Sequence, residues 1–235
     1  KERDGMKIIK IPTVNYFKLE KIVATLVAVI HIAANRKKYD VVHCHSVVPG
    51  AASFLLHLLG IPTVLQMHGI EWQRPRWGDF AKVVLRMFEI LSFRNNELIT
   101  AVSKKQCKYY SDLYGKEIKY IPTGTKVTAP PFPKHLNEFG LQPEGYILFA
   151  GRLVPDKGVH LLIKAFRDTT LSCKLVIAGD CTGEDQYKVL LHELAGNDER
   201  IVFLGFLEGQ PMQELYAYCR LFVLPSAIEG LSLSL

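Results

Sequence analysis

The residues best suited to chemistry in this chain lie in one short loop. Residues 151–158 read Gly-Arg-Leu-Val-Pro-Asp-Lys-Gly, directly after an apolar run and just before a helical pattern that begins near Val159. Arg152 offers a planar fork of donors that suits phosphate oxygens, and Lys157 offers a mobile point charge. The start of the following helix adds about half a positive charge. The loop therefore predicts an anion site, and a diphosphate is the guest that fits it best.

A second polar segment follows another apolar run near the end of the chain. Residues 225–234 read Pro-Ser-Ala-Ile-Glu-Gly-Leu-Ser-Leu-Ser, with the acid at Glu229. The backbone N–H groups of Gly230 and Leu231 can hold sugar or phosphate oxygens if a helix begins there. Both segments follow an expected strand, which is where doubly wound sheets bind their ligands.

Together these segments resemble the family-4 retaining glycosyltransferases of the GT-B fold. In the second half the resemblance rests on the loop 151–158, on Ala178-Gly179-Asp180, on Phe203-Leu204-Gly205-Phe206 and on the segment that begins at Glu229. In the first half it rests on His68-Gly69, Ala101-Val102-Ser103 and Ile121-Pro122-Thr123-Gly124. The motifs occur in the family's order and cover most of the chain.

The resemblance implies an α/β protein with two Rossmann-like, doubly wound domains that face a cleft. It implies transfer of a sugar, with retention, from a UDP- or GDP-linked donor to a saccharide or lipid-linked acceptor in polysaccharide, glycolipid or cell-envelope synthesis. The catalytic residues it implies are His68, Arg152, Lys157 and Glu229. The donor-binding residues it implies are Gly151, Gly179, Asp180, Phe206, Leu207, Gly230, Leu231 and Ser232.

An aromatic and basic segment at residues 71–77 suggests the acceptor side. Tryptophan faces stack on sugar rings, and arginine holds phosphates or carboxylates. Ser103 precedes a helical pattern and is expected to cap it, whether or not it also touches a ligand. The expected acceptor-side residues are Trp72, Arg74, Trp77 and Ser103.

No cofactor or metal ion is expected. A leaving nucleoside diphosphate gains charge as its bond to the sugar breaks, and fixed cations stabilise that charge. No Asp-x-Asp pattern precedes a plausible sugar site. His43 and His45 share one face of an expected strand while Cys44 faces the other way, so this cluster is a weak candidate for a metal site.

Composition is that of a packed globular protein with an anionic partner. The 235 residues are 49% hydrophobic and 22% charged, with a net charge of +6. The positive charge fits a nucleotide sugar, a lipid phosphate or a membrane surface, although it also serves solubility. No nucleic-acid partner is expected.

The five cysteines show no paired spacing, which favours reduced thiols in the cytoplasm. The apolar run 22–34 is too short for a membrane span, so any membrane association is expected to be peripheral.

Short apolar runs alternate with helical patterns, as in parallel sheets covered on both faces. The expected strands are 7–11, 41–44, 63–67, 98–101, 119–121, 146–150, 174–178, 201–204 and 221–224. The expected helices are 20–35, 50–59, 80–94, 104–114, 158–168, 185–195 and 211–217, with another beginning near Glu229. The expected domains are an acceptor-side domain (1–128), a proline-rich linker (129–143) and a nucleotide-sugar domain (144–235).

Both ends are expected to be cut from a longer enzyme. The family's first strand with its glycine-rich turn is missing at the start, and its second glutamate would fall just beyond Leu235. The first domain is therefore expected to lack a strand and the second to be incomplete.

Three other functions compete with sugar transfer. A nucleotide-sugar epimerase of the same fold would need additional acid/base carboxylates, for which Glu71 and Asp79 are the nearby candidates. A nicotinamide-dependent dehydrogenase would need a G-x-G-x-x-G turn, which the sequence lacks. A non-catalytic nucleotide-binding relic is disfavoured by the presence of His68, Arg152, Lys157 and Glu229.

Overall fold

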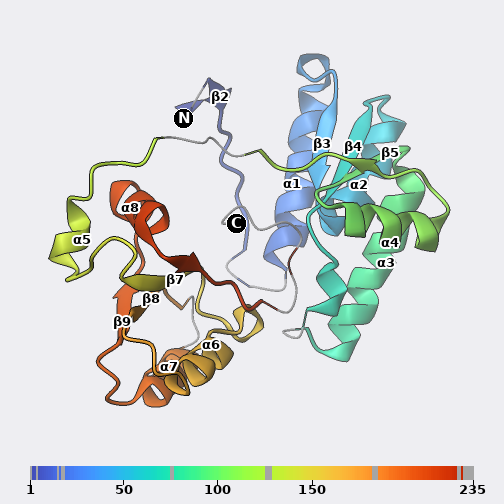
Figure 1. Cartoon of the computed structure of the whole chain (residues 1–235). Helices are drawn as coiled ribbons and strands as arrows, with labels where there is room; N and C mark the ends of the chain where they lie inside the picture. The colour runs from blue at the N-terminus through green and yellow to red at the C-terminus, as the bar shows by residue number, and fades with distance from the viewer. Residues whose placement is uncertain are drawn as a thin grey trace. The chain divides into compact units, whose positions relative to one another are not determined.

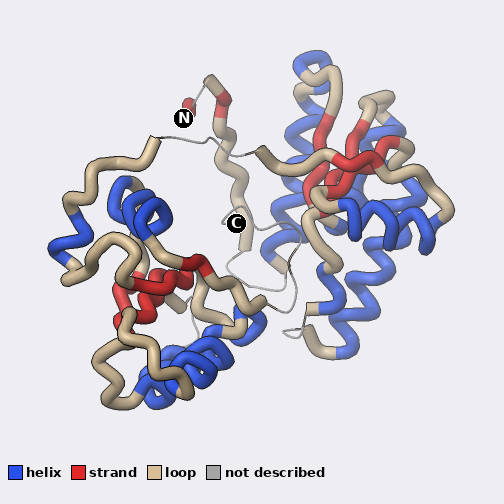
Figure 2. The backbone as a smooth tube through the Cα atoms, viewed as in Figure 1, coloured by secondary structure: helices blue, strands red, loops and turns tan. Residues whose placement is uncertain are grey.

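The computed structural model describes residues 2, 3, 5–14, 16, 19–74, 77–124, 129–181, 185–226 and 229. Their contacts divide the chain into two compact units, residues 1–123 and 124–235. The proline-rich stretch 129–143, expected as a linker, thus belongs to the second unit. Each unit is built around its own four-stranded sheet (Figures 1 and 2).

The first unit contains a parallel sheet in the order β3-β4-β5-β6. Its strands are β3 (Val42–His45), β4 (Thr63–Met67), β5 (Leu98–Ala101) and β6 (Lys119–Tyr120). Its helices are α1 (Glu20–Ala34), α2 (Val47–Leu58), α3 (Asp79–Asn95) and α4 (Lys104–Tyr114), with the 3₁₀ turns η1 (Arg36–Lys38) and η2 (Glu71–Gln73). Buried side chains of the strands pack against α2, α3 and α4, and Leu65, Phe93 and Tyr110 are among the core residues.

The expected first strand, 7–11, is wrong. The structure instead has a small antiparallel pair, β1 (Glu2–Arg3) and β2 (Met6–Lys7), which turns at Gly5 with φ of 75°. Ile8 and Ile9, which suggested a longer strand, are each 42% exposed and lie outside any strand. An apolar run becomes a strand only when a neighbouring strand satisfies its backbone groups, and no strand among the described residues pairs with residues 8–11.

The second unit contains a parallel sheet in the order β10-β7-β8-β9. Its strands are β7 (Tyr146–Ala150), β8 (Lys174–Ala178), β9 (Ile201–Gly205) and β10 (Leu221–Phe222). Its helices are α5 (His135–Glu138), α6 (Val159–Arg167), α7 (Asp185–Ala195) and α8 (Gln210–Tyr218), with the 3₁₀ turn η3 (Pro155–Lys157). Because β10 lies beside β7, the chain reverses direction across the sheet, as in a doubly wound fold.

Both faces of the second sheet are covered. Phe149, Leu175 and Ile177 pack with residues of α6 and α7, whereas Leu148 and Val176 pack with Leu215 of α8 and with α5. Figure 1 shows α6 and α7 on one side of this sheet and α8 on the other. The strands are therefore apolar throughout, which explains why continuous apolar runs predicted them correctly.

Helix α5 falls in the stretch that was expected to be a proline-rich linker. Its first turn is capped from far along the chain by Glu214 of α8, which is fully buried. The Glu214 carboxylate accepts hydrogen bonds from the backbone N–H groups of His135 at 2.7 Å and Leu136 at 3.3 Å. A carboxylate at a helix N-terminus satisfies donors that have no partner within the helix. Such a cap depends on a residue far away in sequence, which local patterns do not show.

A buried asparagine joins α2, α3 and β4 in the first unit. Asn96 Nδ2 donates to Ser53 Oγ at 2.8 Å, and it also lies 3.1 Å from the Gly50 carbonyl. Its Oδ1 accepts from the Thr63 hydroxyl at 2.7 Å. Gly50 is needed for this packing, since a Cβ there would lie 2.6 Å from Leu65. This network fixes the start of β4, the strand that ends immediately before His68.

Asn96→Ala should lower the free energy of unfolding by about 1–3 kcal/mol, because it leaves buried partners of the amide without hydrogen bonds. Chemical denaturation followed by circular dichroism measures this loss. Asn95→Ala is the matched control, since Asn95 is only partly buried and its side chain makes one long hydrogen bond within the described structure, 3.4 Å from the Ala51 carbonyl. Equal losses in the two variants would show that the Asn96 network adds no particular stability.

Candidate functional site

The candidate site in the second unit is built where three parallel strands end together. The loop 151–158 follows β7, Gly179 and Asp180 follow β8, and Phe206 follows β9. Because these strands are neighbours and run in the same direction, their carboxyl ends lie at one edge of the sheet. The polar residues predicted from separate motifs therefore come together.

Backbone hydrogen bonds hold these strand ends close to one another. The N–H of Gly151 donates to the Ala178 carbonyl at 3.0 Å, and the N–H of Gly179 donates to the Gly205 carbonyl at 2.7 Å. Gly179 has φ of 146°, and a Cβ built on it would lie 1.8 Å from the Gly151 carbonyl oxygen. No side chain fits there, so glycine at position 179 is a steric requirement of the packing.

The strand ends surround a cavity of about 530 Å³. Its lining is formed by Ala150, Gly151, Arg152, Ala178, Gly179, Asp180, Phe206, Leu207, Met212 and Tyr216. Five expected donor-binding residues, Gly151, Gly179, Asp180, Phe206 and Leu207, are thus brought together with Arg152. Met212 and Tyr216 from α8 were not predicted, because nothing in the sequence of α8 distinguishes them from ordinary core residues. The size and the mostly apolar lining suit a small organic ligand with a polar end.

Arg152 supplies the positive charge of this cavity. Its side chain is exposed, and no carboxylate of the described residues forms an ion pair with it. Within the described part of the chain, an anionic ligand would therefore displace no carboxylate from this guanidinium. A planar guanidinium at the strand ends is suited to binding phosphate oxygens.

Lys157 lies against Glu229, so the two anion-directed segments of the sequence meet in space. The Lys157 ammonium donates to the Glu229 carboxylate, and both side chains are largely shielded from solvent, with 20% and 30% exposed. Gly158 adopts a left-handed conformation with φ of 71°, and a Cβ there would lie 2.5 Å from the Pro225 carbonyl oxygen. The two segments are therefore packed backbone to backbone. The other residues expected in this segment, Gly230, Leu231 and Ser232, lie outside the described residues, as does the helix expected from Glu229 onwards.

Asp180 is held by neighbouring groups at the edge of the cavity. Its carboxylate accepts from Lys188 Nζ at 2.9 Å and from the N–H of Cys181 at 2.8 Å. The hydrogen bond from Lys188 lowers the pKa of Asp180 below its usual value. The backbone carbonyl of Asp180 also accepts from the N–H of Leu153, which ties the turn after β8 to the loop after β7.

A cluster of imidazoles lies at the strand ends of the first unit. His45 Nδ1 is 2.8 Å from His68 Nε2, and the rings of His43 and His45 are 4.3 Å apart between centroids. His43 and His45 are exposed while Cys44 is buried, as the strand alternation predicted. Burial raises the pKa of the Cys44 thiol to about 11, which disfavours the thiolate that a metal needs. No metal-binding group of three or more such residues occurs in the part of the chain that the structure describes.

The hydrogen bond with His45 fixes the orientation of the His68 ring. A hydrogen bond between two imidazoles needs one donor and one acceptor, so at least one ring is neutral. Burial, together with the nearby charge of His43, lowers the pKa of both His45 and His68. The Gly69 carbonyl next to His68 accepts a hydrogen bond from the Tyr110 hydroxyl at 3.2 Å. The partnership of His45 with His68 was not predicted, although the alternation of His43 and His45 on one strand face was a signal.

The expected acceptor-side residues are separated within the first unit. Trp72 lies in η2, where Arg86 stacks over its ring at 4.8 Å, and Arg74 pairs with Glu71 at 3.0 Å. Trp77 lines a cavity of the first unit. Ser103 caps α4 as predicted, with its hydroxyl accepting from the N–H of Gln106 at 3.3 Å. The ring faces and charges of this segment are thus partly engaged within the protein.

The lowered pKa values of His45 and His68 predict a pH-dependent stability. Histidines of the unfolded chain bind protons near pH 6.5, whereas His45 and His68 in the folded protein bind them only at lower pH. Protons therefore stabilise the unfolded state more, and the free energy of unfolding should fall as the pH drops below about 6.5. Denaturation at pH 8, 7, 6 and 5 measures this fall. In a His45→Gln/His68→Gln variant the fall should be smaller, and an unchanged pH dependence would contradict the argument.

Comparisons with known proteins agree with this architecture. Residues 1–128 match the family described as Glycosyltransferase Family 4, and residues 133–235 match the family described as Glycosyl transferases group 1. The chain spans about half the length of the curated relatives it matches. The uncharacterized glycosyltransferase MJ1607 of Methanocaldococcus jannaschii is 30% identical over 210 residues, which cover 82% of this chain and 53% of the relative.

Two further matches carry informative names. The N-acetylgalactosamine-N,N'-diacetylbacillosaminyl-diphospho-undecaprenol 4-alpha-N-acetylgalactosaminyltransferase of Campylobacter jejuni is 34% identical over 99 residues, 42% of this chain and 26% of its own length. The crystal structure of Alr3699/HepE from Anabaena in complex with UDP and glucose is 25% identical, with a TM-score of 0.71 over 87% of this chain and 57% of that one. The chain therefore belongs to glycosyltransferase family 4, within the group 1 glycosyltransferases of the GT-B fold.

Proposed function

We propose that the protein takes part in transferring a sugar from a nucleoside diphosphate sugar to a saccharide or lipid-linked acceptor. The observation that carries this proposal is the cavity at the ends of β7, β8 and β9, with the guanidinium of Arg152 at its wall. Its apolar part, which includes Phe206 and Tyr216, is suited to a nucleoside, and Arg152 is suited to the diphosphate. UDP is the first donor to test, because the related Anabaena structure holds UDP and glucose.

In this proposal Arg152 and Lys157 stabilise the leaving diphosphate. Negative charge accumulates on the phosphate oxygens as the bond to the sugar breaks, and preorganised cations lower the energy of that state more than that of the bound substrate. Lys157 already has an anionic partner in Glu229, so a bound diphosphate would share this ammonium with the carboxylate or replace it. We propose that these side chains do the work that a metal ion does elsewhere, so that neither a metal nor a cofactor is needed.

Glu229 and His68 are proposed to hold the donor sugar. Glu229 is fixed beside the loop 151–158 by Lys157, where a carboxylate can accept hydrogen bonds from sugar hydroxyls. Burial lowers the pKa of His68, which favours an uncharged imidazole that can donate a hydrogen bond to a sugar hydroxyl or accept one from it. We propose retention of configuration with attack by the acceptor on the face from which the diphosphate leaves.

The acceptor is proposed to be a saccharide, in particular one carried on a lipid phosphate. The Campylobacter relative is named for an acceptor on diphospho-undecaprenol, and the net charge of +6 suits an anionic surface. The structure contains no helix, among the residues it describes, that is long and apolar enough to cross a membrane. We propose a peripheral role at a membrane in polysaccharide or glycolipid synthesis. The five cysteines are free thiols, which fits the reducing cytoplasm.

Calorimetric titration with UDP, GDP and ADP tests the donor proposal. One nucleotide should bind, and Arg152→Ala should weaken its binding by about tenfold to a hundredfold, as expected for a charged hydrogen bond to phosphate. The double variant Arg152→Ala/Lys157→Ala should lose binding further.

Arg220→Ala is the matched control. Arg220 is exposed and precedes β10, so it lies at the opposite end of the strands from the cavity. Its replacement should leave nucleotide affinity unchanged. The donor proposal fails if no nucleotide binds, or if the Arg152 and Arg220 variants bind it equally well.

A further inference from the structure

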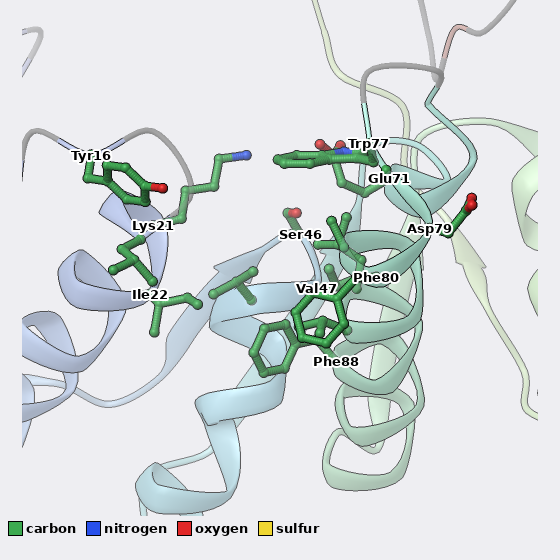
Figure 3. A pocket seen from close by; sticks show the side chains of 16 residues that line it. Tyr16, Lys21, Ile22, Ser46, Val47, Glu71, Trp77, Asp79, Phe80 and Phe88 are labelled. Atoms are coloured by element: carbon green, nitrogen blue, oxygen red, sulfur yellow. The ribbon is translucent and has the colours of Figure 1, made fainter.

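The first unit contains a second cavity, of about 580 Å³, that the proposed donor chemistry does not use. It lies between the start of α1, the turn from β3 into α2, and the first turns of α3 (Figure 3). All its lining residues belong to residues 16–88 and therefore to the first unit. It shares no lining residue with the cavity at the strand ends of the second unit.

The cavity is apolar inside. Three elements contribute aliphatic or aromatic side chains, among them Ile22 from α1, Val47 from α2, and Val84, Leu85 and Phe88 from α3. Figure 3 shows Ile22, Val47 and Phe88 gathered on one side of the space. A sugar placed there would lose hydrogen bonds to water without gaining partners, whereas a hydrocarbon would lose nothing.

The rim of the cavity is polar and carries one cation, Lys21, and two carboxylates, Glu71 and Asp79. Lys21, Ser46, Glu71 and Trp77 lie on the other side of the space in Figure 3, and the Lys21 side chain extends toward Trp77. Glu71 is paired with Arg74 at 3.0 Å and Asp79 with Lys82 at 3.5 Å, so each carboxylate has a cationic partner. No ion pair links Lys21 to a carboxylate of the described residues. A ligand with an apolar body and one anionic end matches this arrangement.

The cavity also continues onto an exposed apolar surface of α3. Phe80 lines the cavity and is 84% exposed, and Val83 and Met87 are 60% and 57% exposed on the following turns. Residues spaced by three and four positions lie on one side of a helix. An exposed apolar stripe beside cationic side chains, here Lys82 and Arg86, is typical of helices that lie at a lipid surface.

We propose that this cavity binds the hydrocarbon chain of a lipid-linked acceptor, with the lipid phosphate at Lys21. That the bound lipid is a sugar acceptor rests on the proposed function. That the cavity binds a phosphorylated apolar chain rests on the cavity alone. The exposed stripe of α3 gives such a chain a continuous apolar route from a membrane surface into the cavity. The cavity thus selects the carrier of the sugar, while other residues select the sugar.

Binding of soluble prenyl phosphates tests the site directly. Geranyl and farnesyl monophosphate, used below their micelle concentrations, should bind and change the tryptophan fluorescence, since Trp77 is at the rim. Farnesyl phosphate should bind more tightly than geranyl phosphate, because each additional buried methylene-sized group raises affinity by about fourfold. Inorganic phosphate alone should bind at least a hundredfold more weakly than farnesyl phosphate.

Two variants locate the chain and the phosphate. Val84→Glu places a charge on the apolar wall and should weaken farnesyl phosphate at least tenfold, whereas Val189→Glu, on the exposed side of α7 with Val189 56% exposed, should not. Lys21→Gln should remove the preference for farnesyl phosphate over farnesol, and Lys37→Gln in η1 should retain it. Circular dichroism and thermal unfolding show whether each variant is folded.

Several outcomes would overturn the proposal. If geranyl and farnesyl phosphate bound equally tightly, or if Val84→Glu left the affinity for farnesyl phosphate unchanged, the prenyl chain would lie outside this cavity. Loss of farnesyl phosphate binding in Arg152→Ala but not in Lys21→Gln would place the phosphate in the second unit. If farnesyl phosphate binds as expected while no nucleotide binds, the lipid site stands and the transferase proposal fails; the reverse result leaves the transferase proposal and removes the lipid site.

Discussion

The close approach of two strand ends in the second unit is the constraint on which the candidate site depends. The Gly151 carbonyl occupies the place where a side chain at position 179 would begin, 1.8 Å from that Cβ position. This contact brings the loop after β7 over the end of β8, and a hydrogen bond from Leu153 to the Asp180 carbonyl keeps it there. The loop then has a fixed course, so Arg152 lies at the cavity and Lys157 reaches Glu229. Without this packing the two cations would be ordinary surface charges.

Close approach of backbone segments also explains why glycines cluster in this site. Gly158 allows the loop to meet the backbone at Pro225, and Gly179 allows it to meet β8. Each position has a backbone atom of another segment where a Cβ would be. Backbone groups can therefore come close to a ligand as well as to one another, which is what an anion site built from N–H groups and a few cations needs.

Much of the fold could be predicted because its strands are buried on both faces. β4, β5, β7 and β8 have the predicted bounds, and each is a short apolar run between polar segments. The stretch 7–11 shows where this reasoning fails, since Ile8 and Ile9 are apolar but have no strand to pair with. Helix α5 shows the opposite failure, because its cap comes from Glu214, far along the chain. Local sequence patterns predict which residues are buried, but they do not predict which residues far apart in the sequence contact one another.

In the candidate site, too, the sequence predicted the local motifs but not the contacts between remote segments. The motifs identified Arg152, Gly179 and Phe206 separately, and parallel topology explains why they border one cavity. The pairing of Lys157 with Glu229 and of His45 with His68 depends on distances between remote segments, which sequence spacing does not encode. The apolar cavity of the first unit was also beyond prediction, because its walls come from three helices whose residues resemble any helix core.

Hydrogen exchange with and without UDP tests the central claim most directly, that a nucleoside diphosphate binds at the ends of β7 and β8. UDP should slow the exchange of backbone amides in residues 151–158 and 178–181, and leave α1 and α2 in the first unit unchanged. Slowed exchange confined to the first unit, or no slowing in residues 151–158 at saturating UDP, would contradict the account.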